Sequence, residues 1–178
     1  LGTHGKQKIG RALRDLIDGG LRDLPAGQRL GIVEISEGSP SFVMDACMAL
    51  DFKRADYCFA STSAATLSDV AAQLKECSPA SETQLIADYP EAAGGKSASA
   101  ASCALAILVL DFGSVELAIK AVDYARGRLV AGGSLIVIGQ HPARWIDFVF
   151  GAQGAGWSQA ESGRWLSSQR PSYFWQQQ

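Results

Sequence analysis

The sequence predicts an α/β fold built on a mostly parallel, doubly wound sheet, and three observations support this. Short apolar runs alternate along the chain with segments of helical periodicity. Glycine-rich or polar turns separate the two kinds of segment. The 178 residues suit one domain with one core. Strands that alternate with helices pair in parallel, and the helices form right-handed crossovers between them. We therefore expect a sheet with helices on both faces.

The N-terminal segment 1–27 is expected to form an amphipathic helix ahead of a core at 28–178. Apolar residues recur at helical spacing, at Ile9, Leu13, Leu16, Ile17, Leu21 and Leu24, and Pro25 and Gly27 end the pattern. The chain starts without Met or a signal sequence. We therefore expect residues 1–178 to be a single domain excised from a multidomain protein.

The core is expected to contain five buried strands, at 30–35, 55–60, 83–87, 103–110 and 134–138. Helices are expected at 41–50, 64–76 and 115–128. The small-residue stretch 92–102 fits either a helix or an eroded loop. The aromatic-rich tail predicts a closing hairpin that adds an antiparallel C-terminal strand around 173–175.

Composition excludes several kinds of partner. Sixteen basic and eighteen acidic residues give a net charge of -2, without the large cationic field that attracts nucleic acid or anionic lipid. The longest apolar stretch, 103–112, contains Asp111 and is far shorter than the ~20 residues that span a bilayer. The four cysteines lack C-x-x-C spacing. The sequence thus predicts a cytoplasmic protein with reduced thiols and no metal site.

A candidate ligand site follows the first strand. In a doubly wound sheet the ligand lies at the carboxyl ends of the strands, where backbone N–H groups of the first turn approach it. This region reads IVEISEGSP at 32–40, with an acid at Glu34 and a glycine at Gly38. These positions resemble the E-x-G-x-G-x-G pattern of S-adenosylmethionine (SAM) methyltransferases, but Ser36 and Pro40 replace the other glycines.

The resemblance extends over nearly the whole chain and is closest to the methyltransferase domains embedded in polyketide synthases and related megasynthases. Segment 21–35 looks like the family's lead-in helix followed by its first strand. Segment 55–61 looks like its second strand. Segment 129–138 looks like L-L-x-P-G-G followed by a strand. Segment 146–151, with the later G-W and closing tryptophan at Trp157 and Trp165, resembles the megasynthase members in particular. The resemblance implies a Rossmann-like class I methyltransferase core.

The sequence departs from the family where the cofactor would bind. Ser61 stands where an acid holds the ribose hydroxyls, and Glu37 would place a negative charge against the methionine carboxylate of SAM. Pro40 removes a backbone donor. The positions that the resemblance assigns to the cofactor, namely Glu34, Ser36, Gly38, Pro40 and Ser61, are therefore expected to be vestigial. No cofactor is expected, or SAM if the domain is active.

The catalytic base is expected to be missing. Megasynthase C-methyltransferases resemble one another in a His/Glu pair, with the His after the fourth strand and the Glu ending the fifth. Segment 108–113 contains no His, and Gly139 stands where the acid is expected. His141 is a weak candidate for a base, although a loop His is more often a surface residue. Glu34 and Asp111 are each interpreted as a ligand or catalytic acid, or as a structural acid.

These observations favour a non-catalytic, methyltransferase-like structural or docking domain of a polyketide or fatty-acid-type synthase. Its expected partners are neighbouring domains of the megasynthase and an acyl carrier protein. The alternative is an active SAM-dependent C-methyltransferase acting on a carrier-bound β-ketoacyl intermediate. A nucleotide or acyl-ligand binding domain is disfavoured, because the sequence has no alternative phosphate loop.

Overall fold

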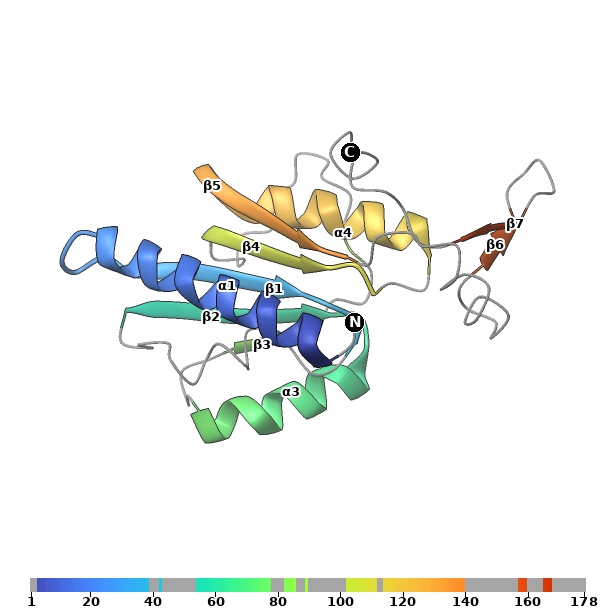
Figure 1. The fold of residues 1–178 in the computed structure, drawn as a ribbon, viewed down its shortest axis with the longest axis horizontal. Helices are drawn as coiled ribbons and strands as arrows, with labels where there is room; N and C mark the ends of the chain where they lie inside the picture. The colour runs from blue at the N-terminus through green and yellow to red at the C-terminus, as the bar shows by residue number, and fades with distance from the viewer. Residues whose placement is uncertain are drawn as a thin grey trace.

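A computed structural model describes residues 3–38, 42, 54–77, 82–85, 89, 102–111, 114–139, 157–159 and 165–167. Figure 1 shows helices on both sides of a twisted sheet. Along the chain the elements are α1 (Thr3–Asp23), β1 (Leu30–Ile35), β2 (Ala55–Ser61), α3 (Ala64–Cys77), β3 (Glu82–Leu85), β4 (Cys103–Val109), α4 (Val115–Arg128), β5 (Leu129–Ile138), β6 (Trp157–Gln159) and β7 (Trp165–Ser167).

The main sheet has the strand order β3-β2-β1-β4-β5, and every neighbouring pair is parallel. The chain moves outward from β1 in one direction through β2 and β3, and in the other through β4 and β5. This order places a topological switch point between β1 and β4, where doubly wound sheets bind ligands. The prediction of a parallel, doubly wound sheet is confirmed.

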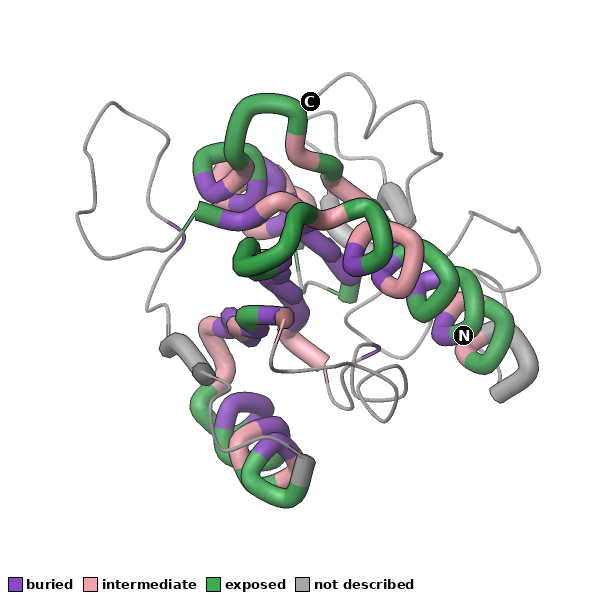
Figure 2. Tube along the Cα trace, turned by 90° about the vertical axis from the view of Figure 1, so that its left-hand side faces the viewer, coloured by how far each residue is buried: buried purple, intermediate pink, exposed green. Residues whose placement is uncertain are grey.

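The two faces of the sheet bury different residues because side chains alternate along each strand. One cluster packs Ile32 and Ile107 against α1 and α3, and the other packs Val33 and Leu108 against α4. Figure 2 shows these buried segments inside the helical layers. The near-continuous burial of β1 and β4 is typical of parallel strands covered on both faces.

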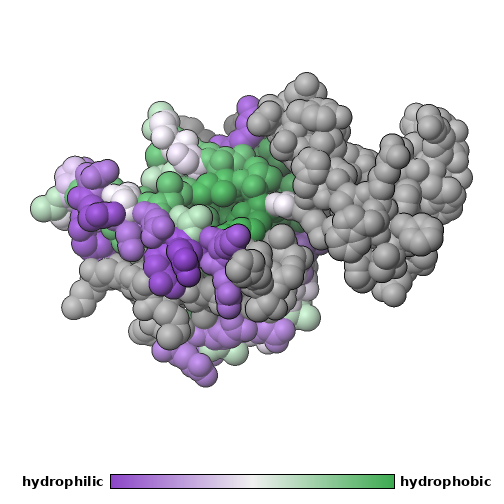
Figure 3. Space-filling view, in the orientation of Figure 1, coloured by the Kyte–Doolittle hydropathy of each residue, from purple (hydrophilic) through white to green (hydrophobic). Residues whose placement is uncertain are grey.

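Some apolar surface remains on the α1 side. Figure 3 shows it over β4 and β5 beside α1, where Ala104 and Ile136 are only partly buried. β5 is the edge strand of the described sheet, and most of its residues are half-buried or exposed. Among the described helices, none has the length and hydropathy needed to cross a membrane.

β5 begins five residues earlier than the expected 134–138. Its pairing with β4 shifts register between Cys103 and Leu105. Gly132 has a φ of 81°, in the left-handed region that only glycine enters without strain. Gly132 lies within this irregular stretch, so Leu129–Ile138 is one strand whose pairing with β4 is interrupted before Ser134.

The prediction of an antiparallel C-terminal strand on the main sheet is wrong for the described residues, where all five strands of that sheet are parallel. β6 and β7 pair with each other and form a separate two-stranded sheet. An aromatic, strand-forming sequence specifies extended backbone but not the edge with which that backbone pairs. Segment 173–175 lies outside the described residues, as do nearly all of 41–50 and of 92–102.

Candidate functional site

The candidate site is the edge of the sheet at which β1, β2 and β4 end. Because these neighbouring strands are parallel, their carboxyl ends meet there. The residues that follow include Ser36 and Gly38 after β1, and Asp111 after β4, while Ser61 ends β2. The structure thus brings together three of the predicted cofactor positions. Pro40 and His141 lie outside the described residues.

Glu34, the predicted remnant acid, is fully buried one residue before the end of β1. Its Oε1 accepts a hydrogen bond from the backbone N–H of Phe42 at 2.9 Å, and its Oε2 accepts one from the hydroxyl of Tyr57 at 3.0 Å. A buried carboxylate needs such partners because it has lost its hydration. Glu34 therefore joins β1 to β2 and to Phe42, which is a structural use of the acid.

The side chain of Glu37 extends over the end of β2. Oε1 accepts hydrogen bonds from the backbone N–H of Thr62 at 3.0 Å and the hydroxyl of Tyr89 at 2.5 Å. Oε2 accepts from the hydroxyls of Thr62 at 2.6 Å and Ser61 at 3.2 Å. Its carboxylate therefore lies where the resemblance placed an acid for the ribose. All four of these donors come from the end of β2 and from Tyr89.

Tyr89, which donates to this carboxylate, belongs to the buried core on the α4 side of the sheet. It is buried, and its ring centroid lies 5.6 Å from that of Tyr124 on α4. Burial, and then the hydrogen bond to Glu37, raise the pKa of the Tyr89 phenol. The phenol thus stays protonated at neutral pH and donates to Glu37.

A second carboxylate covers the turn after β1. Asp111 Oδ1 accepts from the backbone N–H of Glu37 at 3.0 Å. Asp111 Oδ2 accepts from the backbone N–H of Gly38 and from the hydroxyl of Ser36, each at 2.7 Å. The interpretation of Asp111 as a strand-end acid agrees with this position. The helix cap is a different residue, Ser114, whose hydroxyl accepts from Leu117 N–H at 3.1 Å.

Gly139, which stands where a catalytic acid was expected, is exposed and lies beside Leu110. A Cβ atom built on Gly139 would lie 2.9 Å from a side-chain methyl carbon of Leu110. An acid at this position would therefore require Leu110 to move. Among the residues that the structure describes, no group of His, Cys, Asp and Glu side chains is arranged to hold a metal.

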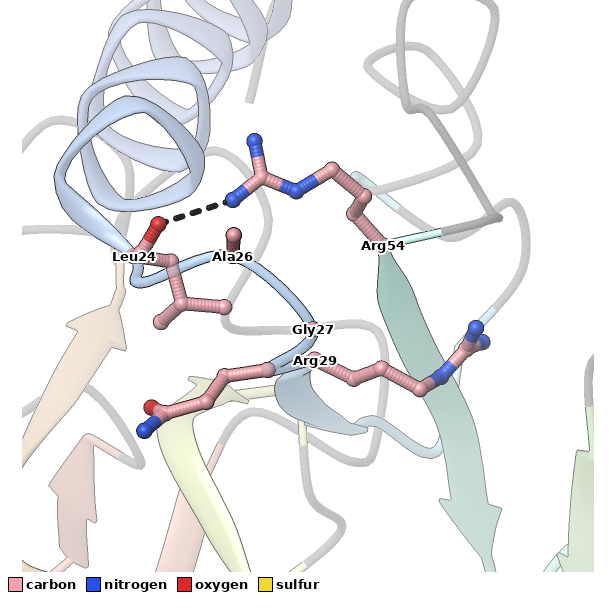
Figure 4. Close-up of a pocket in the computed structure, with 6 residues that line it drawn as sticks. Leu24, Ala26, Gly27, Arg29 and Arg54 are labelled. Carbon is pink, nitrogen blue, oxygen red and sulfur yellow. Dashed lines mark hydrogen bonds between the residues drawn. The ribbon is translucent and has the colours of Figure 1, made fainter.

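A cavity of about 610 Å³ lies at the opposite edge of the sheet, where β1 and β2 begin. Figure 4 shows Arg54 turned toward the end of α1, where its guanidinium donates to the carbonyl of Leu24 at 2.9 Å. Arg29 pairs with Asp56 at 2.7 Å. Both arginines thus serve local structure, and the cavity is separate from the edge where doubly wound sheets bind ligands.

Sequence reasoning missed the contacts that Glu37 and Asp111 make. Asp111 is 73 positions from Gly38, and Tyr89 is 52 from Glu37. Only the strand order brings such distant residues together. A usable signal was present, since two acids, Glu37 and Asp111, each follow a strand expected to end at this edge.

No family model matches the chain, and no curated protein matches it. Solved structures of methyltransferases do match the chain. The CurJ carbon methyltransferase matches with a TM-score of 0.70 and 17% identity over 94% of this chain and 45% of that one. The DszA carbon methyltransferase matches with a TM-score of 0.63 and 16% identity over 85% of this chain and 39% of that one. The chain thus spans less than half the length of either protein.

These likenesses and the parallel sheet show a Rossmann-like methyltransferase fold. At such low identity the likeness extends to the fold alone, since one fold supports many functions.

Proposed function

We propose that this domain is a non-catalytic, methyltransferase-like element of a polyketide or fatty-acid-type synthase, where it supports or docks neighbouring domains. One observation carries the proposal. The carboxylate of Glu37 is held by four hydrogen bonds at the end of β2, where a SAM methyltransferase would bind the cofactor's ribose. The chain's own side chain takes the place of the ligand.

The hydrogen-bond energy of Glu37 in its present position opposes cofactor binding. A hydrogen bond to a charged group contributes about 1.5–3 kcal/mol, and a half-buried carboxylate keeps only part of this. Moving Glu37 off its four donors would cost several kcal/mol by that measure. Micromolar binding amounts to about 8.2 kcal/mol, so such a cost would remove much of it.

The residues do not fit SAM in this arrangement. Ser61 donates to Glu37 and offers no charged acceptor for two ribose hydroxyls. Asp111 would face the methionine carboxylate across the turn after β1 with a like charge. Gly139 stands where the resemblance expects a catalytic acid and offers no proton acceptor. For these reasons we propose no methyl-transfer step.

The proposed partners are the neighbouring domains of a megasynthase and an acyl carrier protein, in the cytoplasm. The sequence resemblance supports this context, and so does the fold shared with the CurJ and DszA carbon methyltransferases. The apolar surface over β4 and β5 beside α1 is consistent with a docking role, because large apolar patches commonly mark contact sites.

The second candidate is an active C-methyltransferase that transfers the methyl group of SAM to a carrier-bound β-ketoacyl chain. The observation in its favour is the fold shared with carbon methyltransferases. Glu37 and Asp111 would both have to leave their present donors for this activity.

Calorimetric titration with SAM tests the proposal. We expect no binding heat up to about 1 mM SAM, which corresponds to less than about 4.1 kcal/mol of binding. A dissociation constant below about 100 μM, roughly 5.5 kcal/mol, would favour the active enzyme instead. Mass spectrometry of a carrier-bound β-ketoacyl substrate incubated with SAM gives the independent readout. Transfer of one methyl group would overturn the proposal.

A further inference from the structure

We propose that the turn after β1 is a carboxylate-binding site that the chain fills from within, with Asp111 as its internal ligand. This contact holds the end of β4 against the turn and keeps other anions off its donors. The inference goes beyond the proposed function, because it concerns what holds the turn, whether or not the domain binds SAM.

Three donors converge on one carboxylate. The backbone N–H groups of Glu37 and Gly38 meet separate oxygens of Asp111, at 3.0 and 2.7 Å, and the Ser36 hydroxyl shares the second oxygen at 2.7 Å. Successive N–H groups that point to one place form an anion-binding concavity. Both oxygens of the carboxylate are therefore used, which is the pattern of a bound ligand.

The backbone of Asp111 is also fixed in position. Leu110 N–H donates to Ile138 O at 2.7 Å and extends the β4 to β5 ladder by one residue. Asp111 N–H donates to Val109 O at 3.0 Å and turns the chain at the strand end. The sheet thus directs the Asp111 side chain toward the turn.

Gly38 provides the space that this contact needs. A Cβ atom at Gly38 would overlap Oδ2 of Asp111. A glycine at this position is therefore explained by the contact with Asp111, without any bound ligand. In this structure the glycine accommodates Asp111 in place of a cofactor.

Solvent can reach the site. Asp111 is exposed as a residue, while Ser36 is buried beneath it. A small anion could therefore occupy the donors if the Asp111 carboxylate were removed. The donor geometry favours a monocarboxylate, and the negative charge of nearby Glu37 limits the site to weak, millimolar binding.

The test uses Asp111→Ala with formate, because alanine keeps Cβ and formate replaces only the missing carboxyl group. We expect the Glu37 and Gly38 amides to exchange hydrogen about tenfold faster in the variant, measured by NMR. Adding about 100 mM formate should slow that exchange and raise the Tm by about 3 °C over equal chloride, as a dissociation constant near 10 mM requires. The unmodified chain should not distinguish formate from chloride.

Asp111→Asn is the matched control. The amide fills the same volume but presents one acceptor oxygen, so one of the two backbone N–H groups should lose protection and formate should have no effect. Unchanged exchange at both amides in Asp111→Asn and Asp111→Ala would overturn the proposal. An equal formate response in all three proteins would also overturn it. If Asp111→Ala does not fold, the asparagine variant alone decides, since its exchange pattern is still expected to change. None of these outcomes depends on the SAM titration.

Discussion

The hydroxyl of Tyr89 and the carboxylate of Glu37 lie 2.5 Å apart, and this hydrogen bond joins the turn after β1 to a residue 52 positions along the chain. The bond closes the ring of donors that holds Glu37 over the end of β2. It is the most remote of these four contacts in sequence, so only the folded chain can form it.

Tyr89→Phe should lower the free energy of unfolding by about 1.5–3 kcal/mol, because it removes one charge-assisted hydrogen bond and keeps the ring beside Tyr124. Urea unfolding measures the change. In a Glu37→Ala background the same substitution should have less than half that effect. Equal effects in the two backgrounds would show that the bond contributes nothing to stability.

The raised pKa of Tyr89 predicts a loss of stability at high pH. The folded chain keeps the phenol protonated above the ordinary pKa of 10.0, whereas the unfolded chain releases the proton. This contribution is fully present below pH 10.0 and is lost as the pH rises toward the raised pKa. Tyr89→Phe should reduce the downward slope of unfolding free energy above that pH by at most about 1.4 kcal/mol per pH unit. An unchanged slope would contradict the buried, hydrogen-bonded phenol.

Gly38→Ala should destabilise the chain by about 1–3 kcal/mol, because its Cβ expels the Asp111 carboxylate from the turn. The effect should largely disappear in an Asp111→Ala background, as measured by urea unfolding of both single variants and the double variant. Gly127→Ala is the matched control. A Cβ there meets open space on the exposed side of α4, so the helix should gain about 1 kcal/mol. Additive effects of Gly38→Ala and Asp111→Ala would contradict the contact.

Glu34→Ala should cost about 2–4 kcal/mol, because it leaves the Phe42 N–H and the Tyr57 hydroxyl without this buried acceptor. Asp56→Ala removes an acid that is also hydrogen-bonded, but to Arg29 on the surface, where 63% of the Asp56 side chain is exposed. Its cost should be under about 1 kcal/mol. Thermal unfolding compares the two. Equally small losses of stability in the two variants would contradict the structural role assigned to Glu34.

Restoring the family's residues at the predicted cofactor positions should restore SAM binding without restoring methyl transfer. Combining Glu37→Ala, Pro40→Gly, Ser36→Gly and Ser61→Asp should restore weak SAM binding, because backbone approach reopens and a charged ribose acceptor returns. Adding Asp111→Ala should tighten it at least tenfold by freeing the turn amides. Calorimetry measures both steps.

Methyl transfer should stay absent in the repaired protein, since neither the His nor the Glu of the base pair is supplied. Asp56→Ala added to the same background is the control and should leave SAM affinity unchanged. A repaired, well-folded protein that binds no SAM would show that something besides Glu37 and Asp111 blocks the predicted cofactor position.

The sequence alone determined the bounds of three strands of the main sheet and of two helices that cover it. Buried apolar runs and helical periodicity located β1, β2, β4, α3 and α4 within a residue or so of their observed bounds, because burial on both faces gives each element a local pattern. The sequence also identified Glu34, Ser36, Gly38 and Ser61 as residues of one edge. The resemblance to methyltransferases correctly anticipated the fold.

Only the tertiary structure decided what occupies that edge. Whether Glu37 faces a cofactor or the end of β2 depends on donors contributed by Ser61, Thr62 and Tyr89, and the role of Asp111 depends on β4 lying next to β1. Likewise, the sequence specified strand-forming segments near the C-terminus, but not that β6 and β7 pair with each other. Such pairings are set by strand order and register between distant segments, and no local pattern encodes them.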